Sequence, residues 1–431
     1  MTVQEFRRLF PILERKVYGK NLVYLDNAAT SQRPQAVLDK FVQVSRESNA
    51  NIYRAVHKLS AEATDYYEQA REATRAFVNA ASREEIIFTS GCTAAVNTVA
   101  YSFGEAFVGA GDEIVVSECE HHSNLVPWQL LCQRKGAALR ILPIDDQGHW
   151  DLGLLKTLLG GEPSGTQAGT RSNQRVKLVA VTHISNVLGL VNPVEEVIRL
   201  CHAAGVPVLV DGAQGIVHEK VDVQAMDCDF YAFSGHKLYA PTGTGVLYGK
   251  KSWLEQMPPF LSGGEMVGTV TLEAATFAGL PHKFEAGTGN FAAVATFPEA
   301  FRTATLAREP RLASAFEATC AYLETALRGR SDLRLYGDTA PLPASVSDKY
   351  SVPYRRAGVF SFTIDGVHHE DVAQILDKMG VAVRSGLMCA EPVIRHFGRE
   401  GMVRVSLAPY NTMEEVEYFI KCLDKAVNML R

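Results

Sequence analysis

Short apolar runs alternate with segments of helical spacing through the first two thirds of the chain. Val208-Leu-Val-Asp211 and Phe230-Tyr-Ala-Phe233 are apolar at almost every position, as in strands that are buried on both faces. Residues 60–80 and 193–205 instead carry apolar side chains three and four positions apart, which is typical of amphipathic helices. This strand–helix–strand rhythm predicts an α/β fold with a mainly parallel sheet, whose ligands gather at the carboxyl ends of the strands.

The last third of the chain has a different pattern. An alanine-rich stretch, residues 297–329, is predicted to be helical, and it leads into a smaller α+β layer. The expected strands of this layer are residues 358–364, 381–384 and 402–407, and the expected helices are residues 368–380 and 412–430. Segments rich in glycine, proline and polar residues predict irregular loops at residues 160–175, 258–290 and 338–356.

The composition is that of an ordinary globular protein. Of the 431 residues, 47% are hydrophobic and 21% are charged. The net charge of −5, with no block of lysine or arginine, argues against nucleic acid or an anionic membrane as a partner. No apolar run reaches the roughly 18 residues that span a bilayer, and the N-terminus lacks the apolar core of a secretory signal. We therefore expect a cytoplasmic enzyme.

The cysteines and paired histidines give little support for a metal site. The eight cysteines are scattered and form no CxxC pair, so a zinc or redox motif is not indicated. His121 and His122 are adjacent, but no further ligands follow at a useful spacing. We expect no metal ion.

Lys237 comes directly after an apolar run, in Ser234-Gly-His-Lys237. A lone lysine at this place is most often a surface residue, but a partly desolvated lysine loses its proton readily and can form a Schiff base with an aldehyde. Asp211 ends the preceding strand-like run, and such an acid can pair with the pyridinium nitrogen of pyridoxal phosphate (PLP). The two residues together indicate a PLP site far more specifically than either one alone.

The segments around these two residues resemble a known family. Val210-Asp-Gly-Ala-Gln214 and Phe233-Ser-Gly-His-Lys-Leu-Tyr-Ala-Pro-Thr-Gly243 are similar to the class V aminotransferases, and most similar to the group II (SufS/CsdA-like) cysteine desulfurases. The resemblance implies a PLP-dependent transferase of fold type I, with a mainly parallel sheet of seven-stranded type. It also implies three parts: residues 1–25, packing on the small domain; residues 26–295, the PLP-binding large domain; and residues 296–431, the small C-terminal domain.

Further residues of the cofactor site follow from local pattern and from the resemblance. Glu85 to Asn97 reads as a strand, a glycine turn and a helix start, a geometry that points backbone N–H groups at an anion. Beside Lys237 this segment becomes the expected phosphate cradle, with contacts from Gly91, Cys92 and Thr93. The resemblance implies that His121 stacks on the PLP ring and handles protons. It also assigns cofactor contacts to Asn186, Gln214, Ser234 and His236, and to Thr288 across the interface of a homodimer.

A second chemical group follows in Arg384-Ser-Gly-Leu-Met-Cys-Ala-Glu-Pro392. A lone cysteine is usually a small buried hydrophobe, but the resemblance makes Cys389 the nucleophile that receives sulfur. Leu387 and Met388 replace the polar pair that relatives carry there. The resemblance assigns the substrate contacts to Ala28, Ala29, Asn186, Arg384 and Arg404, and places Arg54 on a loop that reaches the partner subunit's site.

The leading hypothesis is a PLP-dependent L-cysteine desulfurase. It would convert L-cysteine to L-alanine, leave a persulfide on Cys389, and supply an acceptor protein for iron–sulfur cluster assembly or another thiolation pathway. Three alternatives stay open. The first is a selenocysteine lyase or a cysteine sulfinate desulfinase, and the second is a C–S β-lyase that gives pyruvate. The third is a non-catalytic scaffold of a sulfur-transfer complex.

Overall fold

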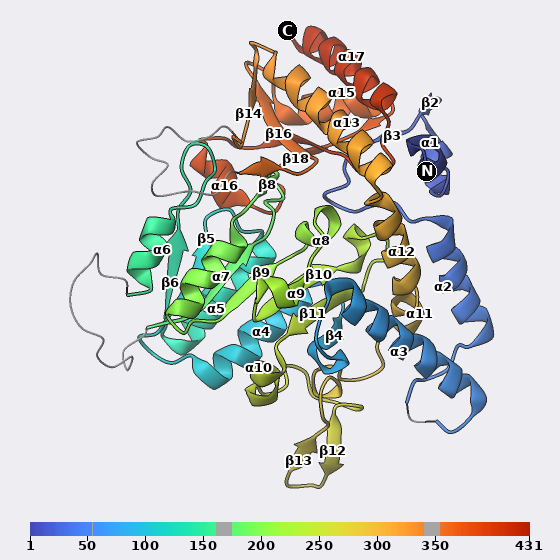
Figure 1. The fold of residues 1–431 in the computed structure, drawn as a ribbon. Coiled ribbons are helices and arrows are strands. Elements are labelled where there is room, and N and C mark those ends of the chain that lie inside the picture. The colour runs from blue at the N-terminus through green and yellow to red at the C-terminus, as the bar shows by residue number, and fades with distance from the viewer. Residues whose placement is uncertain (54, 161–174, 340–353) are drawn as a thin grey trace.

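A computed structural model describes residues 1–53, 55–160, 175–339 and 354–431 (Figure 1). Three sequence predictions fall outside these ranges. They are the role of Arg54 and most of the loops predicted for residues 160–175 and 338–356; in the described part of the second loop, Arg355–Arg356 forms the short strand β15 instead.

A seven-stranded sheet forms the centre of the larger part of the molecule (Figure 1). Its order is β4-β11-β10-β9-β7-β5-β6, and β11 alone runs antiparallel to its neighbours. The predicted α/β fold with a mainly parallel sheet is therefore confirmed. The strands are β4 (Ile86–Thr89), β5 (Glu113–Ser117), β6 (Ala138–Leu142), β7 (Val176–Thr182), β9 (Val208–Asp211), β10 (Phe230–Ser234) and β11 (Gly245–Gly249).

Both faces of this sheet are buried, which explains why its strands are apolar at consecutive positions. In β9, Val208 and Val210 pack into one hydrophobic cluster, and Leu209 packs into the other. The helices that cover the two faces contribute the remaining apolar side chains. They are α2 (Gln35–Glu47), α3 (Lys58–Val78), α4 (Cys92–Phe107), α5 (Val126–Lys135), α6 (Leu152–Leu158), α7 (Val194–Ala203), α8 (Gly215–His218), α9 (Val223–Met226), α10 (Lys251–Gln256), α11 (Phe291–Val294) and α12 (Phe297–Ala307).

A second layer lies at the C-terminal end of the chain. A four-stranded antiparallel sheet, in the order β14-β16-β19-β18, packs against helices through its own hydrophobic cluster. Its strands are β14 (Leu333–Leu335), β16 (Val359–Ile364), β18 (Arg384–Gly386) and β19 (Met402–Ser406), and the helices of this region are α13 (Pro310–Arg328), α15 (His369–Lys378), α16 (Glu391–His396) and α17 (Met413–Leu430). The α+β layer expected from the sequence is present.

The N-terminal residues contact the C-terminal layer. Strand β3 (Val23–Tyr24) pairs with β17 (Val381–Ala382) in parallel. The Phe10 and Tyr410 rings lie 4.6 Å apart between centroids, near the short helix α1 (Val3–Arg7). The remaining short strands are β1 (Lys16–Val17), β2 (Lys20–Asn21), β8 (Leu190–Val191) and β15 (Arg355–Arg356). The domain boundaries after residues 25 and 295 stay a prediction.

One loop prediction is wrong. Within residues 258–290, β12 (Val267–Val270) and β13 (Ala275–Phe277) form an antiparallel hairpin that projects from the body of the molecule (Figure 1). β12 reads Val-Gly-Thr-Val, and valine and threonine favour strands, but Gly268 and the other glycines of this segment made it resemble a loop. None of the described helices is long and apolar enough to cross a membrane.

The buried ion pair between Arg71 and Glu285 connects α3 to strand β4, because Arg71 also donates to the Ile86 carbonyl and Glu285 accepts from the Phe88 N–H. Arg71 donates to both Glu285 carboxylate oxygens at 2.7 and 2.8 Å, and their side chains are 1% and 8% exposed. We expect Arg71→Met to destabilise the protein by about 3–5 kcal/mol, because Glu285 would be left buried without its partner. Urea unfolding followed by circular dichroism measures the loss.

The matched control is Arg199→Met, which removes the exposed pair between Arg199 and Glu196 in α7. This change should cost no more than about 1 kcal/mol. Equal losses of unfolding free energy in the two variants would contradict the expectation that the buried pair contributes more to stability than the exposed pair.

Candidate active site

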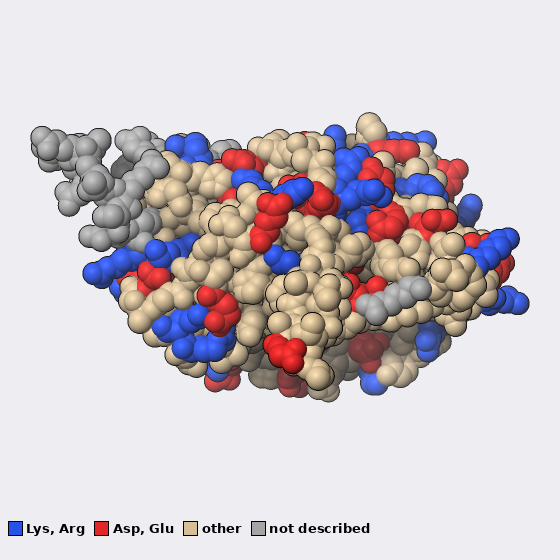
Figure 2. Space-filling model, turned by 90° about the horizontal axis from the view of Figure 1, so that it is seen from below, with Lys and Arg blue, Asp and Glu red and all other residues tan. Residues whose placement is uncertain are grey.

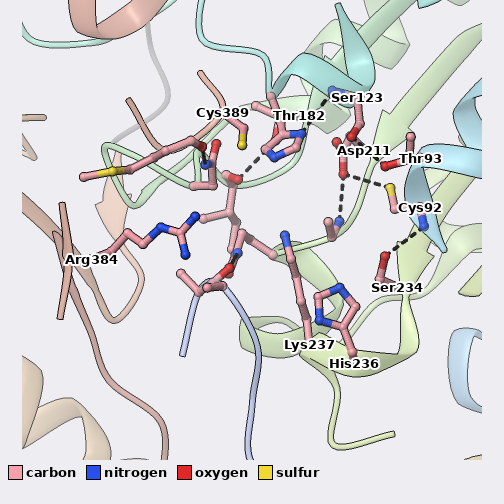
Figure 3. Close-up of a pocket in the computed structure, with 18 of the residues that line it drawn as sticks. Cys92, Thr93, Ser123, Thr182, Asp211, Ser234, His236, Lys237, Arg384 and Cys389 are labelled. Carbon is pink, nitrogen blue, oxygen red and sulfur yellow. Dashed lines mark hydrogen bonds between the residues drawn. The ribbon is translucent and has the colours of Figure 1, made fainter. Parts of the chain in front are cut away.

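A cavity of about 290 Å³ lies at the carboxyl ends of the parallel strands (Figure 3). The structure brings together here most of the residues that the sequence singled out, from both the central sheet and the C-terminal layer. They are Ala28, Ala29, Cys92, Thr93, His121, Asn186, Asp211, Gln214, Ser234, His236, Lys237, Arg384, Cys389 and Arg404. Ser123, Thr182, Ile184, Ala213 and Met388 also line the cavity and were not anticipated.

Lys237 and Asp211 come from adjacent strands. β9 and β10 pair in parallel with Asp211 opposite Ala232, so the residues that follow β10 lie beside the end of β9. Burial lowers the pKa of the Lys237 amine, and the Asp211 carboxylate acts in the opposite direction. The lowered pKa increases the neutral, nucleophilic fraction of the amine, as a Schiff-base lysine requires.

The Asp211 carboxylate is held in one orientation. It is 3% exposed, and its Oδ1 accepts hydrogen bonds from the Ala213 N–H at 2.9 Å and from Cys92 Sγ at 3.4 Å. A carboxylate this deeply buried is favourable only beside groups that stabilise its charge. A protonated pyridine nitrogen fits that requirement, so the donor set is compatible with PLP.

The segment predicted to cradle an anion is the start of α4. Gly91 is the N-cap of this sixteen-residue helix, and the Cys92 N–H donates to Ser234 Oγ at 2.8 Å. Thr93 Oγ1 and Ser123 Oγ are hydrogen-bonded at 2.7 Å. A Cβ on Gly245 would lie 2.5 Å from the Gly91 Cα, so only glycine lets β11 approach the cradle. The first N–H groups of a helix attract anions such as a phosphate.

His121 has a defined tautomer. Its Nδ1 accepts a hydrogen bond from the Ser123 N–H at 3.0 Å, so the proton of the neutral ring is on Nε2. Burial, together with the charge of Lys237, lowers the pKa of His121 to about 4. At neutral pH this ring is therefore uncharged, and its Nε2–H can donate a hydrogen bond.

Glu120 directly precedes His121 but does not itself line the cavity, and its contacts were not predicted from the sequence. It is fully buried, and its carboxylate accepts from Asn124 Nδ2 at 2.7 Å and from the Thr182 N–H at 2.8 Å. Burial raises the pKa of Glu120 to about 8. The residue joins the turn that carries His121 to the end of β7. A glutamate in a polar turn normally predicts exposure, and nothing in the local pattern indicated otherwise.

Arg384 and Arg404 line the side of the cavity nearest the C-terminal layer, and Asp26, which is not part of the lining, lies beside both. Arg384 and Arg404 lie opposite each other on β18 and β19. Asp26 pairs with Arg404 at 3.0 Å and lies 3.9 Å from Arg384, which offsets the repulsion between the two cations. Arg404 is buried, whereas Arg384 is half exposed and its guanidinium points into the cavity (Figure 3). Asp26 was also missed.

Cys389 lies on the loop between β18 and α16, and its side chain points toward the same space as Lys237 (Figure 3). Among the eight cysteines, all within the described ranges, only Cys389 is exposed. Met388 and Cys389 have φ angles of 50° and 55°, a left-handed conformation that costs a non-glycine residue roughly 1–2 kcal/mol. Met388 is 6% exposed and packs into the main hydrophobic cluster. Met388, which stands where relatives carry a polar residue, therefore anchors the glycine-containing loop to the hydrophobic core.

Thr288 is not in this cavity. It lines a second cavity of about 300 Å³, and its hydroxyl donates to Asn51 Oδ1 at 3.0 Å. Its contact with the cofactor of another subunit stays a prediction, as do the individual roles of the other site residues.

Comparison with known proteins identifies the family. A family model described as aminotransferase class-V matches residues 23–419. The chain belongs to this family. The predicted family and the predicted fold type I are confirmed.

Several relatives are similar over the whole chain. A protein named probable cysteine desulfurase from Vibrio cholerae is 43% identical, with 100% of both chains covered. A cysteine desulfurase from Cronobacter sakazakii is 42% identical, covering 100% of this chain and 99% of the relative. The structure of the Escherichia coli cysteine desulfurase CsdA, in an S-sulfonic acid form, matches with a TM-score of 0.85, 36% identity and full coverage of both chains. The predicted kinship with the SufS/CsdA-like cysteine desulfurases is confirmed.

The thiols should differ sharply in reactivity. Burial raises the pKa of the other seven, which are Cys92, Cys119, Cys132, Cys201, Cys228, Cys320 and Cys422. We expect iodoacetamide to alkylate Cys389 in the native protein at least about tenfold faster than any of them. Peptide mass spectrometry measures the order, and Cys389→Ser is the control. Labelling that begins at Cys320 would contradict the exposure seen here.

The stability of the protein should fall in weak acid. Burial lowers to about 4 the pKa of four histidines, His121, His183, His218 and His236. The unfolded chain takes up these protons near pH 6.5 and the folded chain only near pH 4, so stability is lost as the pH falls through this window. Glu120, Glu415 and His202, whose pKa values are raised, act in the opposite direction but are fewer.

Urea unfolding at pH 7, 6 and 5 measures this trend. The variant His218→Phe removes one of the four groups and should make the loss shallower. A free energy of unfolding that rises on acidification would contradict the assignment.

Proposed function

We propose that this protein is a PLP-dependent L-cysteine desulfurase in which Cys389 receives the sulfur. The observation that carries the proposal is the convergence of Lys237 and an exposed Cys389 on one cavity (Figure 3). A lysine and a buried aspartate are needed by PLP enzymes in general, whereas an exposed thiol in the same cavity is needed for sulfur transfer. Full-length similarity to proteins named cysteine desulfurases supports the same conclusion.

The cofactor would be held at three points. The α4 N-terminus with Thr93 would bind the phosphate, Asp211 would pair with the ring nitrogen, and Lys237 would hold the aldehyde carbon. PLP bound in this way supplies an electron sink that weakens bonds at the α- and β-carbons of an amino acid. The Nε2–H of His121 and the hydroxyl of Ser234 would be further polar contacts for the cofactor.

The substrate carboxylate would bind at the arginines. Arg384 is the better placed of the two, because Asp26 already neutralises much of the charge of Arg404. The planar guanidinium offers two parallel N–H groups to a carboxylate. Bound there, the amino group would face Lys237 and the side-chain sulfur would face Cys389.

In the net reaction, L-cysteine and the Cys389 thiol give L-alanine and a Cys389 persulfide. The C–S bond of the substrate breaks, an S–S bond forms at Cys389, and the proton of the thiol is returned to the alanine product. Lys237, whose pKa is lowered by burial, would accept and return protons together with His121. The exposure of Cys389 would let an acceptor protein take the sulfur, for iron–sulfur cluster assembly or another thiolation pathway.

A homodimer would complete the site. The hairpin β12–β13 exposes Val270, Leu272 and Phe277 at 61%, 102% and 50%, and Leu261 nearby is 56% exposed. Uncharged side chains cover much of the middle of the face from which it projects (Figure 2). Exposed apolar groups of this size favour a protein partner, and Thr288 on the same side would reach the partner's cofactor. The cytoplasmic location stays a prediction.

The decisive experiment is to identify the carbon product. PLP-loaded protein given L-cysteine and a thiol reductant should form alanine and sulfide in equal amounts. Cys389→Ser should reduce alanine formation by at least about a hundredfold, while the absorbance of the bound PLP stays unchanged because Lys237 and Asp211 are intact.

Other outcomes separate the alternatives. Pyruvate and ammonia, with no effect of Cys389→Ser, would identify a C–S β-lyase. Turnover of selenocysteine or cysteine sulfinate without turnover of L-cysteine would identify those substrates instead. A colourless protein that takes up no PLP would support a scaffold.

A further inference from the structure

His122 contacts the Cys389 loop at two places. Its backbone N–H donates to the Cys389 carbonyl at 2.7 Å, and its side-chain Nε2 accepts from the Glu391 N–H at 3.2 Å. One hydrogen bond lies at the cysteine itself and the other lies two residues beyond it. The half-buried His122 therefore brackets the residue that would carry the persulfide.

The side-chain contact serves as a helix cap. Helix α16 begins at Glu391, directly after the loop, and its N-cap residue is Ala390, which makes no side-chain capping bond. The first N–H groups of a helix need an acceptor from outside the helix. Pro392 has no N–H, so Glu391 presents the first donor, and His122 supplies the acceptor that alanine cannot.

The conformation of the loop depends on such contacts. Two consecutive non-glycine residues, Met388 and Cys389, are in the left-handed region. Strained residues persist only where the surroundings determine them. The Met388 carbonyl accepts from Asn186 Nδ2 at 2.8 Å and the Cys389 carbonyl accepts from His122. Both donors belong to the part of the chain that carries the cofactor residues, so they fix the loop relative to Lys237.

We propose that the His122 side chain is a positioning residue for Cys389. It caps α16 from a distant part of the sequence and thereby holds the Cys389 thiol toward the cavity. The adjacent histidines then have separate tasks, since His121 lines the cavity and His122 holds the loop; their ring centroids lie 6.3 Å apart. The inference deepens the proposed function and rests on the role of Cys389 in it.

The test compares two substitutions in the PLP-loaded protein. In His122→Gln, the side-chain oxygen is as many bonds from Cβ as Nε2 is in histidine, so the acceptor is kept. In His122→Leu the acceptor is lost and the shape is retained. Each variant is measured for the Cys389 alkylation rate with iodoacetamide, for kcat and KM of alanine formation, for PLP absorbance and for melting temperature.

We expect His122→Leu to alter the alkylation rate and to lower kcat, each by roughly five- to tenfold, the size of effect that loss of one cap produces. KM and PLP absorbance should stay within about twofold of the wild-type values. His122→Gln should restore both affected quantities. The alkylation rate does not depend on turnover, so it tests the loop even if L-cysteine is not the substrate.

Two results would overturn the proposal. In the first, Cys389 of His122→Leu is alkylated at the wild-type rate and the variant forms alanine at the wild-type rate. In the second, both variants lose PLP absorbance and melting temperature together, which would indicate general damage. Should His122→Leu fail to fold, His122→Asn replaces it, because its oxygen is one bond nearer the backbone and cannot reach Glu391 equally well. If Cys389 of the wild-type protein is alkylated but no alanine forms, the result would count against the proposed function and not against the role of His122.

Discussion

The parallel pairing of β9 with β10 is the constraint on which the site depends. It brings the carboxyl ends of two buried strands to one edge of the sheet, where a chain must turn and where backbone groups become free for ligands. Asp211 and Lys237 lie at this edge because their strands end there, not because they attract each other. The other parallel strands add Thr182 and the turn with His121 in the same way. One sheet register therefore positions residues that are far apart in sequence.

The second half of the site is supplied by contacts between distant segments. The residues after β3 run between the two sheets, with the Ala28 N–H donating to Ser406 Oγ and the Ala28 carbonyl accepting from Gln214 Nε2. Asp26, two residues earlier, balances the charge of Arg404. The cavity is thus closed by a segment of irregular backbone that is hydrogen-bonded on both sides. Such a segment can carry small residues close to a ligand without any regular structure of its own.

Much of the fold and most of the cavity could be predicted from the sequence. The apolar runs revealed the strands because burial on both faces leaves no polar positions in them, and motif residues such as Lys237 follow directly from the strand ends. Glu120 and Asp26 were not predictable, because their importance lies in partners more than sixty residues away. The β12–β13 hairpin was missed because its apolar side chains face solvent, so burial gave it no pattern. The Cys389 loop is held through the backbone carbonyls of Met388 and Cys389. Every residue has a backbone carbonyl, so the sequence could not reveal these contacts.

The distribution of thiols has a consequence for oxidative damage. Burial raises the pKa of seven of the eight cysteines and so keeps them as the less reactive thiols, and Cys389 is the one exposed thiol that the protein presents to peroxide. Sulfenic acid formed there would be reversible by thiols, whereas further oxidation to sulfinic or sulfonic acid would not. A persulfide on the same atom would add an expendable outer sulfur, which reduction could remove to regenerate the thiol. Turnover itself would then protect the nucleophile, and an idle enzyme would be the more vulnerable one.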